Sequence, residues 1–315
     1  MTNCGASSES CCTSLDVLGG SYDRTYDFDD AGALELSTDG GTGEADPATV
    51  SRFRLDKYLV TVGRFRQFVN AWRGGAGYAP PAGSGKHGHL NGGHGLTATG
   101  GGNEPGWAES DDSNIAPTNA NLACDPTFAT WTNTAGSQEN LPINCVNWYE
   151  AYAFCIWDSG FLPSAAEWEY AAAGGSQQRE YPWGSTAPGT ACPGTGCQYA
   201  IYSCDYPNGT GRGDGGLGAC TGVANIAPVG TATRGAGLWG QLDLAGNVNE
   251  WNLDWYAGYV DPCTDCADFT ASSSGRVFRG GNFSYGATLL LSSLIYDLAP
   301  SSRSDLIGFR CARSP

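Results

Sequence analysis

Helical periodicity of apolar residues is confined to three short segments of this chain, and glycine interrupts most of the sequence between them. The 315 residues include 47 glycines and 16 prolines, which end regular elements. Ten tryptophans are spread along the chain. We therefore expect an irregular, loop-rich α+β fold in which aromatic side chains hold non-repetitive backbone around a large core.

Each periodic segment begins at a residue that caps helices. The first covers residues 61–72 and stops at a glycine pair. The second begins at Asn147, with Glu150 three residues later, and the third begins at Ser164, with Glu167 three residues later. This spacing is the capping box, in which the cap and the glutamate satisfy each other's backbone N–H groups. We expect three helices that pack together in the core.

Short, partly alternating apolar runs predict strands at residues 15–18, 53–60, 277–279 and 308–311. The stretch 74–140 is rich in Gly, Asn, Ser and Thr and shows little periodicity, so we expect ordered surface loops there.

Acidic residues outnumber basic ones by 32 to 16, which gives a formal charge of −16. Such a chain repels nucleic acid and anionic membranes and favours cation binding. Its apolar runs are shorter than a membrane span, and it has no Gly-x-Ser-x-Gly elbow or Walker loop. We expect no nucleic-acid partner and no membrane span.

Thirteen cysteines are too many for a reduced cytosolic domain unless they bind metal. A zinc ribbon needs two Cys-x-x-Cys knuckles, and here Cys263-Thr-Asp-Cys266 stands alone. Disulfides are the better interpretation. They predict a protein exported to the cell surface, the extracellular space or a bacterial periplasm. Because no secretory signal follows Met1, we expect an export signal upstream of it.

Nearness along the chain suggests four disulfides. The pairs are Cys124 with Cys145, Cys192 with Cys197, Cys204 with Cys220, and Cys263 with Cys266. Cys4, Cys11 and Cys12 leave an odd thiol, whose partner lies upstream, in another chain, or nowhere. The odd cysteine is one basis for a hypothesis of self-assembly.

All three histidines, His87, His89 and His94, lie in one glycine-rich stretch. Imidazoles so spaced suit zinc or copper. A solvated loop is the interpretation that we favour over a metal site.

Two acidic residues seven positions apart flank a glycine-bearing turn in Asp243-Leu-Ala-Gly246-Asn-Val248-Asn-Glu250. Carboxylates beside inward-facing carbonyls suit a hard cation that takes oxygen ligands. The alternative is that both are ordinary acids of a loop and of the core rim.

Several motifs together resemble one known family. They are Leu162-Pro-Ser-Ala-Ala-Glu-Trp-Glu-Tyr170, Pro182-Trp-Gly184, Leu244 to Trp251, Arg276-Val-Phe-Arg-Gly-Gly-Asn-Phe-Ser-Tyr-Gly286 and Gly308-Phe-Arg-Cys-Ala-Arg313. The chain resembles the formylglycine-generating enzymes, also called sulfatase-modifying factors. This resemblance implies a C-type-lectin-like fold with few short helices and small antiparallel sheets. It also implies one domain over residues 15–315, after a Cys/Ser-rich segment at residues 1–14.

The resemblance extends to an active-site frame without its reactive groups. Members of that family oxidise a substrate cysteine at a copper ion held by two cysteines, which follow the Arg-Gly-Gly turn. In this chain Tyr285 and Leu290 occupy those positions. Neither side chain replaces a soft thiolate ligand of Cu(I). We therefore expect no copper and no catalytic residues.

The resemblance also implies a disulfide and a calcium site. The disulfide joins Cys155 to Cys311. The structural Ca²⁺ ion takes side-chain oxygens of Asp243 and Glu250 and carbonyls of Gly246 and Val248. A second calcium site of the family is not expected, because Ala200 replaces an asparagine ligand.

In the family, the stretch 282–307 lines the substrate cleft. Here Tyr285, Tyr296 and Arg303 are candidates for contact with a protein or glycan partner. The alternative is that the leucines of this stretch simply build core. We expect an exported, non-catalytic binding or structural protein. A sub-hypothesis is that it assembles with copies of itself. The competing hypothesis is a copper-dependent oxidase that converts a sulfatase cysteine to formylglycine through another cysteine arrangement.

Overall fold

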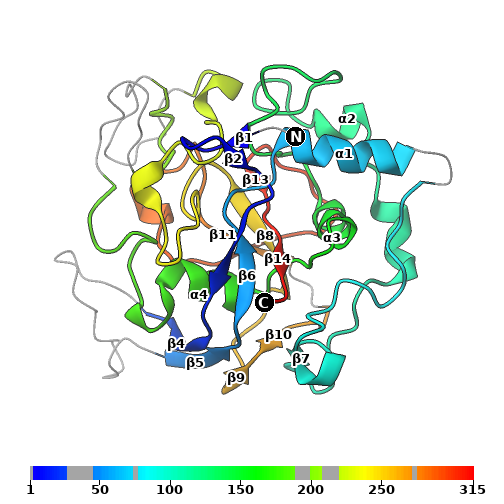
Figure 1. Ribbon diagram of the computed structural model, residues 1–315, viewed down its shortest axis with the longest axis vertical. Coiled ribbons are helices and arrows are strands. Elements are labelled where there is room, and N and C mark those ends of the chain that lie inside the picture. Colours follow the sequence, from blue (N-terminus) through cyan, green and yellow to red (C-terminus); the bar gives the residue numbers. More distant parts are fainter. Residues whose placement is uncertain (1–2, 27–44, 74–76, 189–198, 208–219, 272–274) are drawn as a thin grey trace.

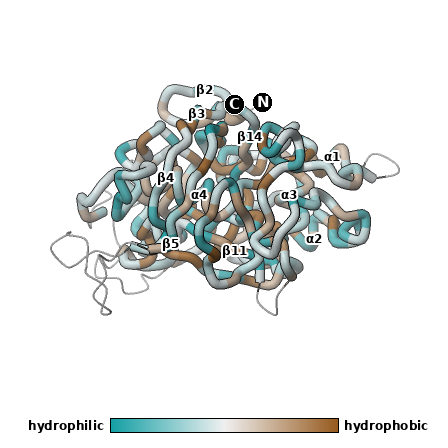
Figure 2. The backbone as a smooth tube through the Cα atoms, turned by 90° about the horizontal axis from the view of Figure 1, so that it is seen from below, coloured by the Kyte–Doolittle hydropathy of each residue, from teal (hydrophilic) through white to brown (hydrophobic). Residues whose placement is uncertain are grey.

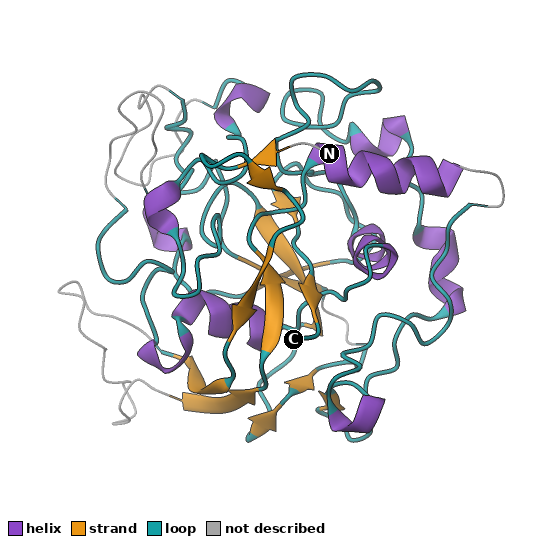
Figure 3. Cartoon of the chain, in the orientation of Figure 1, coloured by secondary structure: helices purple, strands orange, loops and turns teal. Residues whose placement is uncertain are grey.

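The computed structural model describes residues 3–26, 45–73, 77–188, 199–207, 220–271 and 275–315 (Figure 1). Short strands cross the middle of the molecule, and loops make up most of the rest (Figure 3). Helices α1 and α3 lie on one side of these strands and α4 lies on the other (Figure 1). The expected irregular, loop-rich α+β fold is confirmed.

The three expected helices are present. They are α1 (Val62–Arg73), α3 (Trp148–Trp157) and α4 (Ala165–Ala173). The structure also contains α2 (Asn119–Leu122), a helix of a single turn. Both capping boxes form, at Asn147 and at Ser164. Gly174 ends α4 in the left-handed conformation, with φ of 66°. The described part of the chain also contains six short 3-10 helices. They are η1 (Asn91–Gly93), η2 (Glu109–Asn114), η3 (Gly175–Gln177), η4 (Val223–Asn225), η5 (Thr233–Gly235) and η6 (Ala287–Leu289).

The described strands form five small sheets. In order across each sheet they are β1 (Asn3–Cys4) and β2 (Glu9–Ser10); β10 (Cys266–Ala267) and β7 (Thr97–Ala98); β12 (Tyr296–Leu298), β11 (Arg276–Arg279), β8 (Asn249–Trp255) and β13 (Ile307–Gly308); β14 (Ala312–Arg313), β6 (Phe53–Asp56) and β3 (Ser14–Val17); and β4 (Gly20–Thr25), β5 (Ala45–Val50) and β9 (Cys263–Thr264). Three pairs are parallel, namely β13 with β8, β10 with β7 and β5 with β9, so the sheets are mixed rather than purely antiparallel.

Two strand predictions were too long. The run 53–60 forms a strand only as far as Asp56. The run 308–311 is split, because β13 ends at Gly308 and β14 begins at Ala312. Between them the carbonyls of Phe309 and Cys311 accept hydrogen bonds from Val60 and Asp56, so the backbone changes partners there.

The expectation that all three helices pack together was wrong for α4. Apolar residues of α1 and α3 share one large buried cluster. The side chains of α4, among them Trp168 and Tyr170, belong to a second cluster with residues of β4, β5 and β6. In Figure 2 segments of hydrophobic residues lie between α4 and α3. Every residue of α4 is buried, so this helix lies inside the molecule on all its faces.

Disulfides tie these parts together. Four expected pairs are confirmed: Cys155–Cys311, Cys124–Cys145, Cys204–Cys220 and Cys263–Cys266. The expected pair Cys192–Cys197 lies outside the described residues. Cys4 pairs with Cys11 next to the β1–β2 hairpin. Such disulfide density is typical of proteins that mature outside the cytoplasm. Within the described ranges, none of the helices combines the length and apolarity of a membrane span.

Candidate functional site

The turn after β11 leads the chain into the segment 282–290, which contains Tyr285 and Leu290. Gly280 and Gly281 have φ of 99° and 68°, a conformation that favours glycine. A Cβ atom on Gly281 would lie 2.5 Å from the carbonyl oxygen of Leu289, so the two ends of segment 281–289 touch at this point. The carbonyl of Gly280 also accepts a hydrogen bond of 2.7 Å from Gly246 N–H. The turn is thereby held against the segment 243–250.

Asn282 shapes the chain immediately after the turn. Its side-chain oxygen accepts hydrogen bonds from the backbone N–H groups of Ser284 and Tyr285, at 2.9 and 3.2 Å. The Tyr285 carbonyl in turn accepts a hydrogen bond of 2.9 Å from Ser203 N–H. This Asx turn fixes where the Tyr285 side chain leaves the backbone, and the side chain is half-buried.

Leu290, which the family resemblance sets at the second cysteine position, is a buried hydrocarbon side chain. Its side chain is 1 % exposed and belongs to a buried cluster. The other buried members of this cluster are Tyr181, Ala200, Tyr202 and Ala245. An isobutyl group in an apolar cluster offers no electron pair to a metal ion. In the part of the chain that the structure describes, no group of three or more His, Cys, Asp or Glu side chains is arranged to hold a metal ion.

A cysteine does lie beside the frame. Cys204 N–H donates a hydrogen bond of 2.7 Å to the Phe283 carbonyl. Its sulfur is bonded to Cys220, so it is a disulfide and not a thiolate. The structure therefore places the Cys204–Cys220 disulfide beside the backbone that leads to Tyr285.

The segment 243–250 is buried and negatively charged. Asp243 and Glu250 are 3 % and 0 % exposed. Both Glu250 oxygens bind the Arg310 guanidinium, at 2.6 and 2.8 Å, while one Asp243 oxygen accepts Gly230 N–H at 2.6 Å. Burial and, to a smaller extent, the nearby Glu250 raise the pKa of Asp243 to about 6, against the opposing effects of that hydrogen bond and of Arg310.

One cation faces two carboxylates in this segment, so ionisation of both leaves one buried negative charge. A carboxylate has about four lone-pair sites, and the contacts above use one at Asp243 and two at Glu250. Lone pairs therefore remain on both carboxylates for a hard cation, although Arg310 binds both oxygens of Glu250. The ion pair between Glu250 and Arg310 was not predicted from the sequence. The arginine in Gly-Phe-Arg-Cys was its only signal.

The other two candidate contact residues differ from each other. Tyr296 lies in the edge strand β12, half-buried, and stacks on Phe278 with ring centroids 5.7 Å apart. The Arg303 guanidinium instead binds Glu150 in a bidentate ion pair at 2.5 and 2.6 Å. It also donates to the Cys145 carbonyl. Arg303 therefore serves the fold, by holding the glutamate that caps α3.

The interpretation of the histidine stretch as a solvated loop was wrong for His87. This side chain is 0 % exposed. One ring nitrogen contacts both oxygens of Glu104, at 3.0 and 3.1 Å, and the other contacts Glu167 at 2.9 Å. Burial lowers the pKa of His87, but the two carboxylates raise it by more, to about 10. His87 is thus an imidazolium that joins its loop to the capping glutamate of α4.

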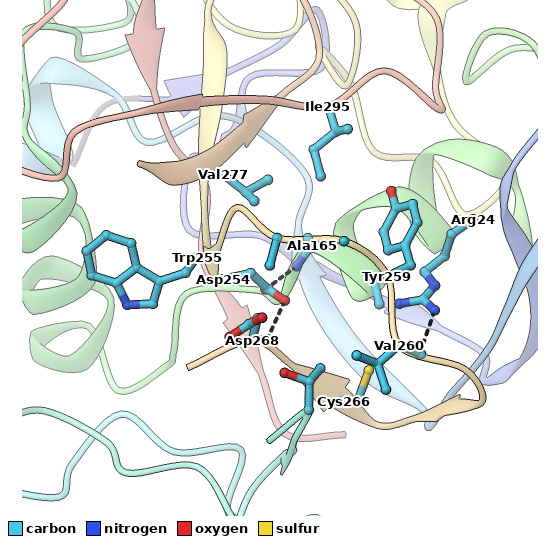
Figure 4. A pocket seen from close by; sticks show the side chains of 14 residues that line it. Arg24, Ala165, Asp254, Trp255, Tyr259, Val260, Cys266, Asp268, Val277 and Ile295 are labelled. Atoms are coloured by element: carbon cyan, nitrogen blue, oxygen red, sulfur yellow. Dashed lines mark hydrogen bonds between the residues drawn. The ribbon is translucent and has the colours of Figure 1, made fainter. Parts of the chain in front are cut away.

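The hollow in Figure 4 is small, and its lining mixes apolar and charged side chains. Its cavity of about 30 Å³ has room for about one or two waters. The Asp254 carboxylate accepts hydrogen bonds from the N–H groups of Ala165 and Asp268, at 2.7 and 3.1 Å. Burial raises the pKa of Asp254 to about 6 against these hydrogen bonds. This carboxylate anchors the start of α4 and has no room beside it for a substrate.

Comparison with known proteins agrees with the motifs. The profile of the family described as "Sulfatase-modifying factor enzyme 1-like domain" matches residues 5–315. A formylglycine-generating enzyme of Thermomonospora curvata is 28 % identical over 306 residues, which cover 87 % of this chain and 86 % of that protein. A mouse protein named inactive C-alpha-formylglycine-generating enzyme 2 is 30 % identical over 205 residues, which cover 59 % of this chain and 55 % of that protein.

Among solved structures, PvdO from Pseudomonas aeruginosa superimposes with a TM-score of 0.60. The match covers 98 % of this chain and all of that one, at 19 % sequence identity. At that identity the likeness establishes the fold, which is the expected formylglycine-generating-enzyme (C-type-lectin-like) architecture.

Proposed function

The chain belongs to the sulfatase-modifying factor enzyme 1-like family. We propose that it is an exported, non-catalytic binding or structural protein built on the family scaffold. The observation that carries the proposal is the pair Tyr285 and Leu290, which stand where the family resemblance expects the copper-binding cysteines. A relative whose name declares it inactive supports the view that this scaffold persists without catalysis.

The proposal includes export and surface contact. The disulfides support maturation in an oxidising compartment, at the cell surface or outside the cell. Tyr285 and Tyr296 remain our candidate contact residues, because both are half-buried and tyrosine supplies large contact area at low entropic cost. The partner is a protein or glycan, or a second copy of this chain.

We expect the purified protein to leave a cysteine-containing sulfatase-motif peptide unchanged in the presence of Cu(I) and oxygen. The physical reason is that a phenol and an isobutyl group do not bind Cu(I). Mass spectrometry of the peptide measures the conversion to formylglycine, with the Thermomonospora curvata enzyme as the positive control.

The matched variant restores the sulfur ligands. Tyr285→Cys/Leu290→Cys should bind about one equivalent of Cu(I) that the parent protein does not bind, in competition with a chromogenic chelator. Conversion of the peptide by the unmodified protein would overturn the proposal.

The alternative function, a copper-dependent oxidase, has one observation in its favour. Cys204 and Cys220 lie beside the Phe283–Tyr285 segment, and their reduction would provide two thiols there. If the unmodified protein does convert the peptide, loss of this activity in Cys204→Ser would assign the chemistry to that pair.

We also propose a structural calcium ion at the segment 243–250. Asp243 and Glu250 would hold it through carboxylate oxygens, and Gly246 and Val248 through carbonyls. Bound there, the ion would neutralise the surplus negative charge in the interior. It would take no part in catalysis.

Removal of calcium is expected to destabilise the protein. At a calcium concentration one hundred times Kd, binding stabilises the folded state by about 3 kcal/mol, so the EDTA-treated protein should melt several degrees lower. Asp243→Asn keeps an acceptor for Gly230 N–H but removes the charge, and its melting temperature should not respond to calcium. Magnesium is the control cation. Identical melting of the unmodified protein with EDTA and with calcium would remove the support for the site.

A further inference from the structure

A cavity of about 160 Å³ lies beside the start of α3, away from the segment 282–290. The η2 region, α3, β8 and the first residue of β11 contribute to its wall. Six of its lining residues are Pro105, Asp111, Trp148, Tyr152, Phe269 and Arg276. The wall thus combines three aromatic side chains and other apolar residues with one arginine and one aspartate.

Arg276 is held in this cavity by stacking and by one hydrogen bond. Its guanidinium carbon lies 3.8 Å from the ring centroid of Trp148 and 4.2 Å from that of Trp255. One terminal nitrogen donates to the Leu253 carbonyl at 2.7 Å. Stacking between two indoles fixes the plane of the guanidinium and attracts its charge without using its N–H groups.

The donors of Arg276 are largely unused. Within the described residues it forms no ion pair, its Nε atom is buried without a partner, and its second terminal nitrogen makes no hydrogen bond. A guanidinium has five N–H donors, and buried polar groups in proteins normally find partners. Burial lowers the pKa of Arg276 to about 10 against the opposing effect of nearby acids, of which Asp254 is the strongest.

Asp111 adds a negative charge to the same cavity. Its carboxylate lines the same cavity and is half-buried, with no ion pair to Arg276 within the described residues. Burial raises the pKa of Asp111, and Arg276 lowers it in opposition. A negative charge close to the bound anion disfavours a dianion more than a monoanion.

We propose that this cavity binds a monocarboxylate carried on a small apolar or aromatic group, with the carboxylate on Arg276 and the apolar group among Trp148, Tyr152 and Phe269. A planar carboxylate matches the paired N–H groups of a guanidinium. The aromatic walls supply the apolar contact that a ligand pocket needs. Free carboxylic acids and carboxylates of peptides share this chemistry. None of the lining residues lies in the segment 282–290, which holds Tyr285 and Leu290, so the proposal does not rest on the proposed function.

Isothermal titration calorimetry with phenylacetate tests the site. We expect saturable one-to-one binding by the unmodified protein, no binding of phenylacetamide, and binding of phenyl phosphate at least tenfold weaker than that of phenylacetate. Asp111→Asn should bind phenylacetate several-fold more tightly, because it removes the repulsion. A peptide ending in phenylalanine, compared with its C-terminal amide, then distinguishes a peptide carboxylate from a free acid as the source.

The arginine variants complete the test. Arg276→Gln should weaken phenylacetate binding at least tenfold and Arg276→Lys less, while Arg54→Gln, at an exposed arginine, should leave it unchanged. Circular dichroism checks the fold of each variant. If Arg276→Gln does not fold, the amide probe and Asp111→Asn still decide the question. Equal binding of acid and amide, equal or tighter binding of phenyl phosphate, or no saturable binding of phenylacetate overturns the proposal.

Discussion

Replacing Cys155 and Cys311 together by alanine is expected to lower the free energy of unfolding by about 5 kcal/mol. The disulfide joins residues 156 positions apart, and it ties α3 to the chain just before β14. In the chain-entropy model a crosslink restricts the unfolded chain more when the closed loop is longer. Both cysteines are fully buried, so their replacement by alanine leaves no polar group without a partner. Urea unfolding under non-reducing conditions measures the change.

The matched control is the Cys4→Ala/Cys11→Ala variant. That disulfide spans only seven positions, and the same model gives it about 2 kcal/mol. The prediction is therefore a difference between two double variants of the same chemistry. Equal losses in both would show that loop length does not set the stability of this protein.

His87→Leu is expected to destabilise the protein at pH 7 by about 3 to 5 kcal/mol. The substitution leaves Glu104 and Glu167 buried without their shared cation, and an uncompensated buried charge is costly. Part of this loss of stability arises at the start of α4, because one Glu167 oxygen accepts hydrogen bonds from both His87 and the Ser164 N–H. Chemical denaturation at fixed pH gives the value.

The same group predicts a dependence on pH. The pKa of His87 is about 10 in the folded protein against an ordinary value of 6.5, so its stabilising effect is complete below pH 6.5. That stabilisation falls as pH rises through about 10. We expect the unmodified protein to lose stability between pH 6.5 and pH 9.5, and His87→Leu to lack this component.

His94→Ala is the control for both measurements, because His94 is an exposed histidine of the same stretch. It should match the unmodified protein in stability and in pH response. If His87→Leu and His94→Ala unfold alike, the imidazolium contributes nothing measurable.

Local features of the fold were predictable from the sequence. A capping box depends on two residues three positions apart, so Asn147 with Glu150 and Ser164 with Glu167 gave the starts of α3 and α4 without knowledge of the tertiary structure. Disulfides between near neighbours were predictable for a similar reason. The long Cys155–Cys311 pair came from the family resemblance, since spacing alone does not determine pairing.

Features that join distant segments were not predictable. The position of α4 depends on β4 and β5, which lie more than a hundred residues before it. The burial of His87 depends on Glu167, 80 positions away, which the sequence indicated only as a capping residue. Arg276 belonged to a recognised motif, but its stacking on Trp148 and Trp255 involves three separate elements. Composition described the glycine-rich stretch as solvated because a single buried ion pair leaves no compositional trace.

The burial of Leu290 has a consequence for its replacement by cysteine. A thiol at this position would be smaller than the isobutyl group that now packs against Tyr181 and Tyr202. Leu290→Cys would open a void, at a cost of about 1 to 3 kcal/mol, before a second substitution at position 285 could complete a metal pair. Leu290→Cys is thus expected to be harmful by itself, so building a metal pair at positions 285 and 290 requires a first substitution that destabilises the fold.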